Sequence, residues 1–388
     1  MVGVCFFLKL TRFHDKLSGM DQGSGKIKFL DSMRAVATMA VFIFHAGYLL
    51  FSYPDHQAGI INLTRFVYFG GTVGVSMFFV LSGFLLFYQM IDRDEPVTKA
   101  MLWRYAKKRM LRILPLYYFS LFFIILFLKP DILFVPDGLR SILFNLFFLR
   151  GIKGSNGGGT ITIDPVYWTL VIEMHFYVLL PIFYYIFRKY KKMLWFFILI
   201  LIGLAYRIAV IAVFKSPSMQ LLRFTPANFD FFAFGMLGAY LYANYGRLFE
   251  FIGKSYLQML SLLVFLLFWR FYDFDFLPTS AYVLMPILLG AILMFCLLSF
   301  VVNAKTFLSK LFTSTPMLFV AKISFSIYVW HALVIQKVDG LLVSNNAKFL
   351  LSVIITLIVS TVSYYAVEAP FLKLKSKVKP AAPASPQF

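Results

Sequence analysis

The stretch RAVATMAVFIFH, residues 34–45, decides the fold because it is apolar except at its two ends. Arg34 opens the stretch and His45 closes it, and no charged residue lies between them. A helix turns by about 100° per residue, so eleven steps bring both side chains to one face, about 16 Å apart along the axis. The apolar segment continues over residues 32–52 and is long enough to cross a bilayer. A membrane-crossing helix with a cation and an imidazole on one face calls for a functional explanation.

The rest of the chain shares this apolar character. Of its 388 residues, 61% are hydrophobic, 14% are charged and 48 are Phe. A soluble domain of this length cannot bury so much apolar surface, which indicates a polytopic integral membrane protein. We therefore predict an all-α helical bundle with about ten transmembrane helices. The expected spans lie near residues 32–52, 70–91, 112–129, 166–187, 193–214, 226–243, 256–272, 281–301, 317–337 and 348–369.

The positive charge of the chain follows this topology. The sequence has 37 Lys and Arg against 17 Asp and Glu, a net charge of +20. When the amino terminus is placed inside, most of the basic residues fall on cytoplasmic segments and inner helix ends, so the bias places both termini in the cytoplasm. We predict a cytoplasmic basic leader (1–28), a transmembrane domain (29–370) and a cytoplasmic basic tail (371–388). The topology then explains the net positive charge without a nucleic-acid partner. Anionic membrane lipid is the expected secondary partner.

Neither the cysteines nor the glycines indicate a metal or nucleotide motif. Cys5 and Cys296 have no spacing typical of a disulfide framework or a metal site, so we expect no metal. The run GIKGSNGGGT, residues 151–160, lacks the Gly-Lys-Ser/Thr ending of a phosphate loop. It is either a flexible connector or a lid over an outer substrate cleft.

Three ionisable side chains fall in the outer halves of expected spans. They are His45 in the first span, Glu173 in the fourth and His331 in the ninth. An ionisable group inside the membrane costs a few kcal/mol, so three of them at one depth indicate an active site between helices. The alternative is structural: a lone helix histidine is commonly a packing residue, and His331 has Ser324 and Tyr328 as possible hydrogen-bond partners.

A second polar group lies at the inner ends of the spans. Arg34 begins the first span, and the segment YAKKRMLRILP brings Lys107, Lys108, Arg109 and Arg112 to the start of the third. Arg109 and Arg112 are three residues apart and so share a helix face. This cluster suits a phosphate-bearing ligand that arrives from the cytoplasm. For the two lysines, ordinary anchoring at the inner membrane surface is an equal alternative.

Other polar residues of the spans have structural interpretations. His175 is two residues from Glu173 and points elsewhere. Arg207 and Asp230 are expected to pair in a salt bridge, with acceptor binding as the second interpretation. Glu368, near the inner end of the last span, is expected to cap a helix or to pair with a basic loop.

Taken together and in order, these segments resemble the membrane-bound acyltransferase-3 family, which O-acylates cell-surface glycans. The stretches that carry the resemblance are FLDSMRAVATMAVFIFH, GTVGVSMFFVLSGFLL, RYAKKRMLRILPLYY, YWTLVIEMHFYVLLP, ISFSIYVWH and VEAP. They cover residues 29–370, and several ordered motifs are a specific signal where each alone is weak. Lys108-Arg109 stands where the family usually has two arginines.

The resemblance implies a donor, an acceptor and a set of site residues. The donor is acyl-CoA, generally acetyl-CoA, used from the cytoplasm, and the acceptor is a glycan hydroxyl on the other side of a bacterial inner membrane. By motif match, His45 is the catalytic histidine, Arg34 its partner and Glu173 the acidic residue. The donor-side residues are Arg109 and Arg112 with Lys108, and possible supporting roles fall on Ser82, Tyr328 and His331.

These residues suggest a mechanism along one helix face. The nucleotide of CoA would bind at the inner basic cluster, and its flexible arm would bring the thioester to His45. The imidazole would accept the proton of the attacking hydroxyl, or would itself accept the acyl group, with Glu173 orienting it. The main alternative is a proton-coupled transporter or flippase of a glycan-related substrate, and a third is a structural subunit. The acceptor (lipopolysaccharide O-antigen, peptidoglycan, exopolysaccharide or a lipid-linked sugar) and the oligomeric state stay open.

Overall fold

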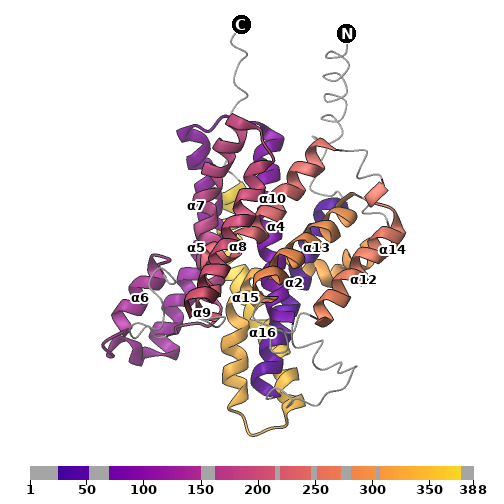
Figure 1. Ribbon diagram of the computed structural model, residues 1–388. Helices are drawn as coiled ribbons and strands as arrows, with labels where there is room; N and C mark the ends of the chain where they lie inside the picture. The colour runs from indigo at the N-terminus through magenta and orange to yellow at the C-terminus, as the bar shows by residue number, and fades with distance from the viewer. Residues whose placement is uncertain are drawn as a thin grey trace, which may run out of the picture.

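The computed structural model describes residues 25–51, 70–149, 162–214, 219–245, 251–271, 281–302 and 306–376. All regular structure within these ranges is helical, which confirms the predicted all-α class (Figure 1). The long helices are α2 (Gly25–Leu50), α4 (Gly70–Arg93), α5 (Lys99–Phe123), α7 (Tyr167–Tyr190), α8 (Leu194–Phe214), α10 (Phe229–Asn244), α12 (Ser255–Phe271), α13 (Ala281–Val302), α15 (Thr315–Asp339) and α16 (Asn345–Ser363).

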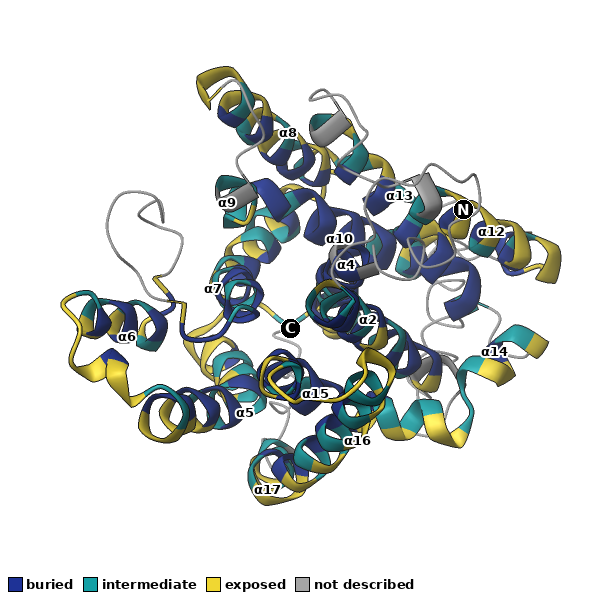
Figure 2. Ribbon diagram, turned by 90° about the horizontal axis from the view of Figure 1, so that it is seen from below, coloured by how far each residue is buried: buried dark blue, intermediate teal, exposed yellow. Residues whose placement is uncertain are grey.

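Short elements connect or extend these helices. They are the π-helical turns η1 (Ile124–Leu128) and η5 (Tyr364–Glu368), the 3₁₀ turns η2 (Pro130–Leu133) and η3 (Thr225–Asn228), and the helices α6 (Gly138–Leu146), α9 (Met219–Leu222), α14 (Phe307–Phe312) and α17 (Ala369–Ser376). In Figures 1 and 2, α6 lies at the margin of the bundle, outside α5 and α7.

Each of the ten predicted segments contains a helix, but not all are long enough to cross a bilayer. Seven described helices pass a test of length and apolar composition, and an eighth is added if the bent α15 counts as one span. The bend, 73°, separates Thr315–Lys322 from Ser324–Asp339. Helices α10 and α12 are shorter, with 16 and 17 residues. The number of about ten spans and the cytoplasmic placement of both termini therefore stay predictions, and most of the leader and tail lies outside the described residues.

The centre of the bundle is formed by α2, α4 and α10, which carry mostly buried residues in the end-on view of Figure 2. Close approach of α4 and α10 depends on glycine. A Cβ at Gly83 would lie 2.4 Å from the carbonyl oxygen of Phe232, and one at Gly235 would lie 2.1 Å from that of Val80. Gly74 meets α2 in the same way, 2.6 Å from the carbonyl oxygen of Ala37. Small residues that let helix backbones touch are typical of membrane bundles.

Apolar side chains also cover the outside of the bundle. Phe127, Leu201, Ile358 and Val362 are all more than half exposed. A continuous apolar exterior of this kind is unfavourable in water and matches a lipid environment. Together with the long apolar helices, it supports an integral membrane protein.

Two sets of polar contacts that were predicted to be structural connect neighbouring helices of the bundle. Arg207 Nη2 of α8 lies 2.6 Å from Asp230 Oδ2 of α10, and both side chains are essentially buried. His175 of α7 contacts Thr225 Oγ1 at 2.7 Å and the carbonyl oxygen of Phe148 at 2.9 Å. Both structural interpretations are confirmed, and these contacts fix α7 and α10 beside the cavity described next.

Candidate active site

A cavity of about 680 Å³ lies inside the bundle, with walls from α2, α4, α5, α7, α15 and α17. Its volume falls within the usual range for small-molecule sites. One end of the lining consists of Asp31 near the start of α2, Arg93 at the end of α4 and Lys375 of α17. We call this the basic end of the cavity. The other end of the lining reaches Thr169 of α7 and Tyr328 of α15.

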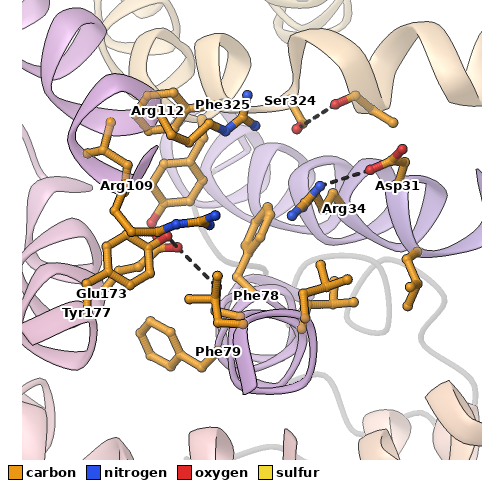
Figure 3. A pocket seen from close by; sticks show the side chains of 18 of the residues that line it. Asp31, Arg34, Phe78, Phe79, Arg109, Arg112, Glu173, Tyr177, Ser324 and Phe325 are labelled. Atoms are coloured by element: carbon orange, nitrogen blue, oxygen red, sulfur yellow. Dashed lines mark hydrogen bonds and ion pairs between the residues drawn. The ribbon is translucent and has the colours of Figure 1, made fainter. Parts of the chain in front are cut away.

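Four arginines line the cavity: Arg93, and the three that the sequence predicted to form a basic cluster. Figure 3 shows Arg34, Arg109 and Arg112 pointing into the same space from α2 and α5. Arg34 Nη1 is paired with Asp31 Oδ1 at 2.9 Å, and Arg112 Nη1 with Glu368 Oε1 at 2.6 Å. Glu368 was predicted to cap a helix or to pair with a basic loop, and its partner is instead an arginine of helix α5.

Arg109 differs from the other two arginines. Among the described residues it forms no ion pair, and its buried Nε has no hydrogen-bond partner. Its guanidinium instead lies over the rings of Tyr105 and Tyr177, 5.9 Å from each centroid. A cation held against aromatic rings without a carboxylate is available to an anionic ligand.

The structure does not bring Lys108 into the main cavity. Lys108 lines a neighbouring cavity of about 60 Å³, which also touches Arg104 and Arg109. Lys107 is exposed, consistent with the anchoring interpretation. Lys108 and Arg109 therefore point in different directions, because neighbouring residues on a helix are about 100° apart.

Glu173 lies in the main cavity with the arginines. Ser82 Oγ of α4 donates a hydrogen bond to Glu173 Oε1 at 3.0 Å, and Tyr177 OH donates to the same oxygen. Glu173 and Tyr177 are four residues apart, on one face of α7. Ser82, predicted as a possible supporting residue, thus joins Glu173 at the cavity wall.

The expectation that Glu173 lies at the depth of His45 and His331 is not met. The register of α7 against α15 is fixed by Thr169 Oγ1 and Tyr328 OH, which are 2.6 Å apart and buried. The two helices run in opposite directions. Glu173 is four residues along α7 from this contact and His331 three residues along α15 the other way, and the hydrogen bonds of Glu173 among the described residues are with Ser82 and Tyr177 and not with either histidine. Glu173 therefore belongs to the arginine cavity and not to the histidines.

His45 and His331 contact each other. His331 Nε2 lies 3.2 Å from His45 Nδ1, and the rings meet edge to face at 4.9 Å. His331 Nδ1 faces the backbone carbonyl oxygens of Ile327 at 3.1 Å and of Tyr328 at 2.8 Å. His45 Nδ1 also faces the carbonyl oxygen of Val41 at 2.9 Å. The two predicted histidines thus form a pair, one helical turn along α15 from Tyr328.

The carbonyl contacts determine the protons of a neutral histidine pair. A carbonyl oxygen only accepts, so Nδ1 of His331 must donate, which leaves its Nε2 as an acceptor. Nδ1 of His45 then donates to Val41 O and to His331 Nε2. Nε2 of His45 is left without a proton, and among the described residues it makes no hydrogen bond. A nitrogen in this state is able to accept a proton from a substrate.

A further cation, absent from the predicted site, lies near the histidine pair. The guanidinium of Arg223 is 5.2 Å from the ring centroid of Trp168 and within electrostatic range of His45 and Tyr328. Burial lowers the pKa of the Arg223 guanidinium. Arg223 lies in a short connection before η3, where hydropathy gives no signal. Among the described residues, no group of three or more His, Cys, Asp or Glu side chains is placed to hold a metal ion.

Comparison with known proteins identifies the family of the chain. Residues 27–365 match the acyltransferase-3 family, described as an acyltransferase domain, and the chain belongs to that family. The chain is 26% identical to the peptidoglycan O-acetyltransferase OatA of Listeria monocytogenes, over 89% of this chain and 55% of the relative. It is 23% identical to the O-acetyltransferase OatA of Staphylococcus aureus (strain NCTC 8325), over 89% of this chain and 57% of the relative. The chain thus spans a little over half the length of these relatives. No solved structure matches it.

Proposed function

We propose that this chain is an O-acetyltransferase that moves an acetyl group from acetyl-CoA to a hydroxyl of an extracytoplasmic glycan. Family membership and the names of the relatives support the reaction. The Listeria relative is named for peptidoglycan, which makes peptidoglycan the first acceptor to test, with lipopolysaccharide O-antigen second. The basic end of the cavity is assigned to the cytoplasm of a bacterial inner membrane, in agreement with the positive-inside rule.

One observation carries the proposal: a cavity lined by Arg34, Arg109 and Arg112 reaches Tyr328, one helical turn from the paired histidines, which do not themselves line it. Phosphate groups of CoA would bind at the arginines, among them Arg109, which forms no ion pair among the described residues. The flexible arm of CoA would then pass Ser82 and Glu173 toward His45. Glu173 serves here as a positioning residue of this passage.

His45 is the proposed catalytic base. Its Nε2 accepts the proton of the acceptor hydroxyl, whose oxygen attacks the thioester carbonyl carbon. The carbon–sulfur bond then breaks, and the departing CoA thiolate takes the proton from the imidazolium. In the alternative route, Nε2 attacks the thioester itself and forms an acetyl-histidine that the hydroxyl then attacks. In both routes only the acetyl group crosses to the acceptor.

The experiment compares wild type with His45→Ala and Arg109→Gln. Purified protein is titrated with acetyl-CoA to measure Kd, and acetyl transfer to peptidoglycan fragments is followed by mass spectrometry. We expect His45→Ala to abolish transfer with an unchanged Kd. Arg109→Gln should raise Kd about tenfold or more, because it removes a charged partner of a phosphate. Arg112 is a poorer choice, since its removal would also leave buried Glu368 unpaired.

The result that contradicts the proposal is normal transfer by His45→Ala or no binding of acetyl-CoA by wild type. Incubation with labelled acetyl-CoA in the absence of acceptor separates the two routes. Label trapped on His45 indicates the acetyl-histidine route, and its absence indicates direct transfer.

A second candidate function is a proton-coupled transporter or flippase. The 73° bend of α15 favours it, since broken helices with polar groups near the midplane are common in transporters. Such a protein has no use for acetyl-CoA. Binding of acetyl-CoA by the purified protein therefore decides between the two functions.

A further inference from the structure

Helix α17 forms part of the cavity wall although it lies beyond the family match, which ends at residue 365. It follows the π-helical turn η5 at the end of α16. Glu368, the last residue of this turn, is 2% exposed and accepts hydrogen bonds from Arg112 at 2.6 Å and from Ser326 Oγ at 3.1 Å. The end of α16 is thus anchored to α5 and α15, and α17 starts from a fixed point.

One face of α17 points into the cavity. Leu372 and Lys375 follow Glu368 by four and seven residues, a spacing that places all three on one helix face. Both Leu372 and Lys375 line the cavity, whereas Lys373 is exposed and does not line it. Phe371 and Leu374, on the other faces, are 39% and 49% exposed. The direction of Lys375 therefore follows from the helix geometry.

Lys375 adds a further cation to a lining that already holds four arginines and Lys322. Its amine is within electrostatic range of Arg34, Arg109, Arg112 and Lys108, and also of the buried carboxylate of Glu368. Among the described residues Lys375 forms no salt bridge, and in this respect it resembles Arg109. Cations gathered at one cavity repel each other, and a ligand that carries several negative charges removes this repulsion.

We propose that Lys375 binds a phosphate group of the acyl-CoA donor at the basic end of the cavity, so that α17 is one wall of the donor site. The inference rests on the proposed function. It adds a ligand residue and a structural element that no motif of the family match contains. Lys375 lies at the cavity end farthest from the histidine pair, where the nucleotide of CoA, with its diphosphate and 3′-phosphate, would lie.

The test measures Kd for CoA and for 3′-dephospho-CoA with the full chain in nanodiscs of zwitterionic phosphatidylcholine. The variants are Lys375→Ala, Lys375→Arg and, as the matched control on the same helix, Lys373→Ala. We expect Lys375→Ala to raise Kd for CoA about tenfold, the size of a charged hydrogen bond to phosphate. Lys375→Arg should retain most of the affinity, and Lys373→Ala should equal wild type.

The comparison of CoA with 3′-dephospho-CoA identifies the phosphate group that Lys375 binds. A loss confined to CoA assigns Lys375 to the 3′-phosphate, and an equal loss for both ligands assigns it to the diphosphate; either supports the proposal. An unchanged Kd for Lys375→Ala overturns it. So does a loss seen only when anionic phosphatidylglycerol is added, which would make a lipid headgroup the ligand. If wild type binds neither ligand, the proposed function itself fails, a result distinct from the others.

Discussion

At the residue scale, the contact between His331 and His45 supplies what a carboxylate supplies in hydrolase triads. In such triads an acceptor group holds one imidazole nitrogen protonated and leaves the other free to act as a base. Here the acceptors for His45 Nδ1 are His331 Nε2 at 3.2 Å and Val41 O at 2.9 Å. His331 is itself oriented by two backbone carbonyls and is 1% exposed. In the proposed mechanism it is a positioning residue, which acts on the substrate only through His45.

Replacement of His331 tests this role. We expect His331→Phe to lower kcat by about 100-fold, because His45 then loses the side chain that orients its ring and keeps only Val41 O as an acceptor for Nδ1. His331→Gln should recover part of the rate, since its amide oxygen accepts a hydrogen bond. The measurement is kcat for acetyl transfer together with Kd for acetyl-CoA. An equal loss of kcat in His331→Phe and His331→Gln, or a changed Kd for acetyl-CoA, would indicate that His331 has a packing role instead.

The histidine pair also shows where sequence reasoning succeeds and where it stops. His45 and His331 were placed at one depth by counting residues along two apolar helices, and they do meet. Glu173 was placed with them by the same count, but it lines the arginine cavity, where it accepts hydrogen bonds from Ser82 of α4 and from Tyr177. Such a contact between distant segments leaves no trace in the hydropathy of either helix.

At the element scale, the sequence predicts the long helices but not the turns that connect or extend them. The long apolar runs predict helices at all ten positions because lipid exposure and helix periodicity act locally. The π-helical turn η5 shifts the face of the following residues and brings Lys375 into the cavity, and no local sequence rule announces it. Lys375 was accordingly assigned to a cytoplasmic tail.

The contact of α4 with α10 gives a prediction at this scale. In Gly235→Ala the new Cβ would lie 2.1 Å from the Val80 carbonyl oxygen, so the two helices must separate. We expect a loss of about 2 kcal/mol in stability, seen as a lower Tm in detergent. The same shift would move Ser82 away from Glu173 and raise Kd for acetyl-CoA. The control is Gly340→Ala, where the nearest atom is 3.7 Å away and Tm should not change.

At the scale of the whole molecule, the mechanism depends on which side of the membrane the basic end faces. Acetyl-CoA is a cytoplasmic metabolite carrying several negative charges, so its cavity must open inward and the histidine pair must be reachable from outside. Lys373 is exposed near the basic end, and Leu342, in the turn between α15 and α16, is fully exposed near the other. Because Lys373 and Leu342 lie at opposite ends of the bundle, one of them must be accessible from the cytoplasm and the other from outside the cell.

Cysteine labelling measures this orientation directly. In a background with Cys5 and Cys296 changed to Ser, Leu342→Cys should react with an impermeant maleimide in right-side-out vesicles. Lys373→Cys should react only after detergent is added. The reverse pattern would open the arginine cavity to the outside, where no acetyl-CoA is present, and the donor assignment would fail even if the purified protein bound CoA. In the proposed function, orientation and donor chemistry have to agree, because the cations of the basic end would serve both: they would hold it at the cytoplasmic face and would bind the phosphates that arrive there.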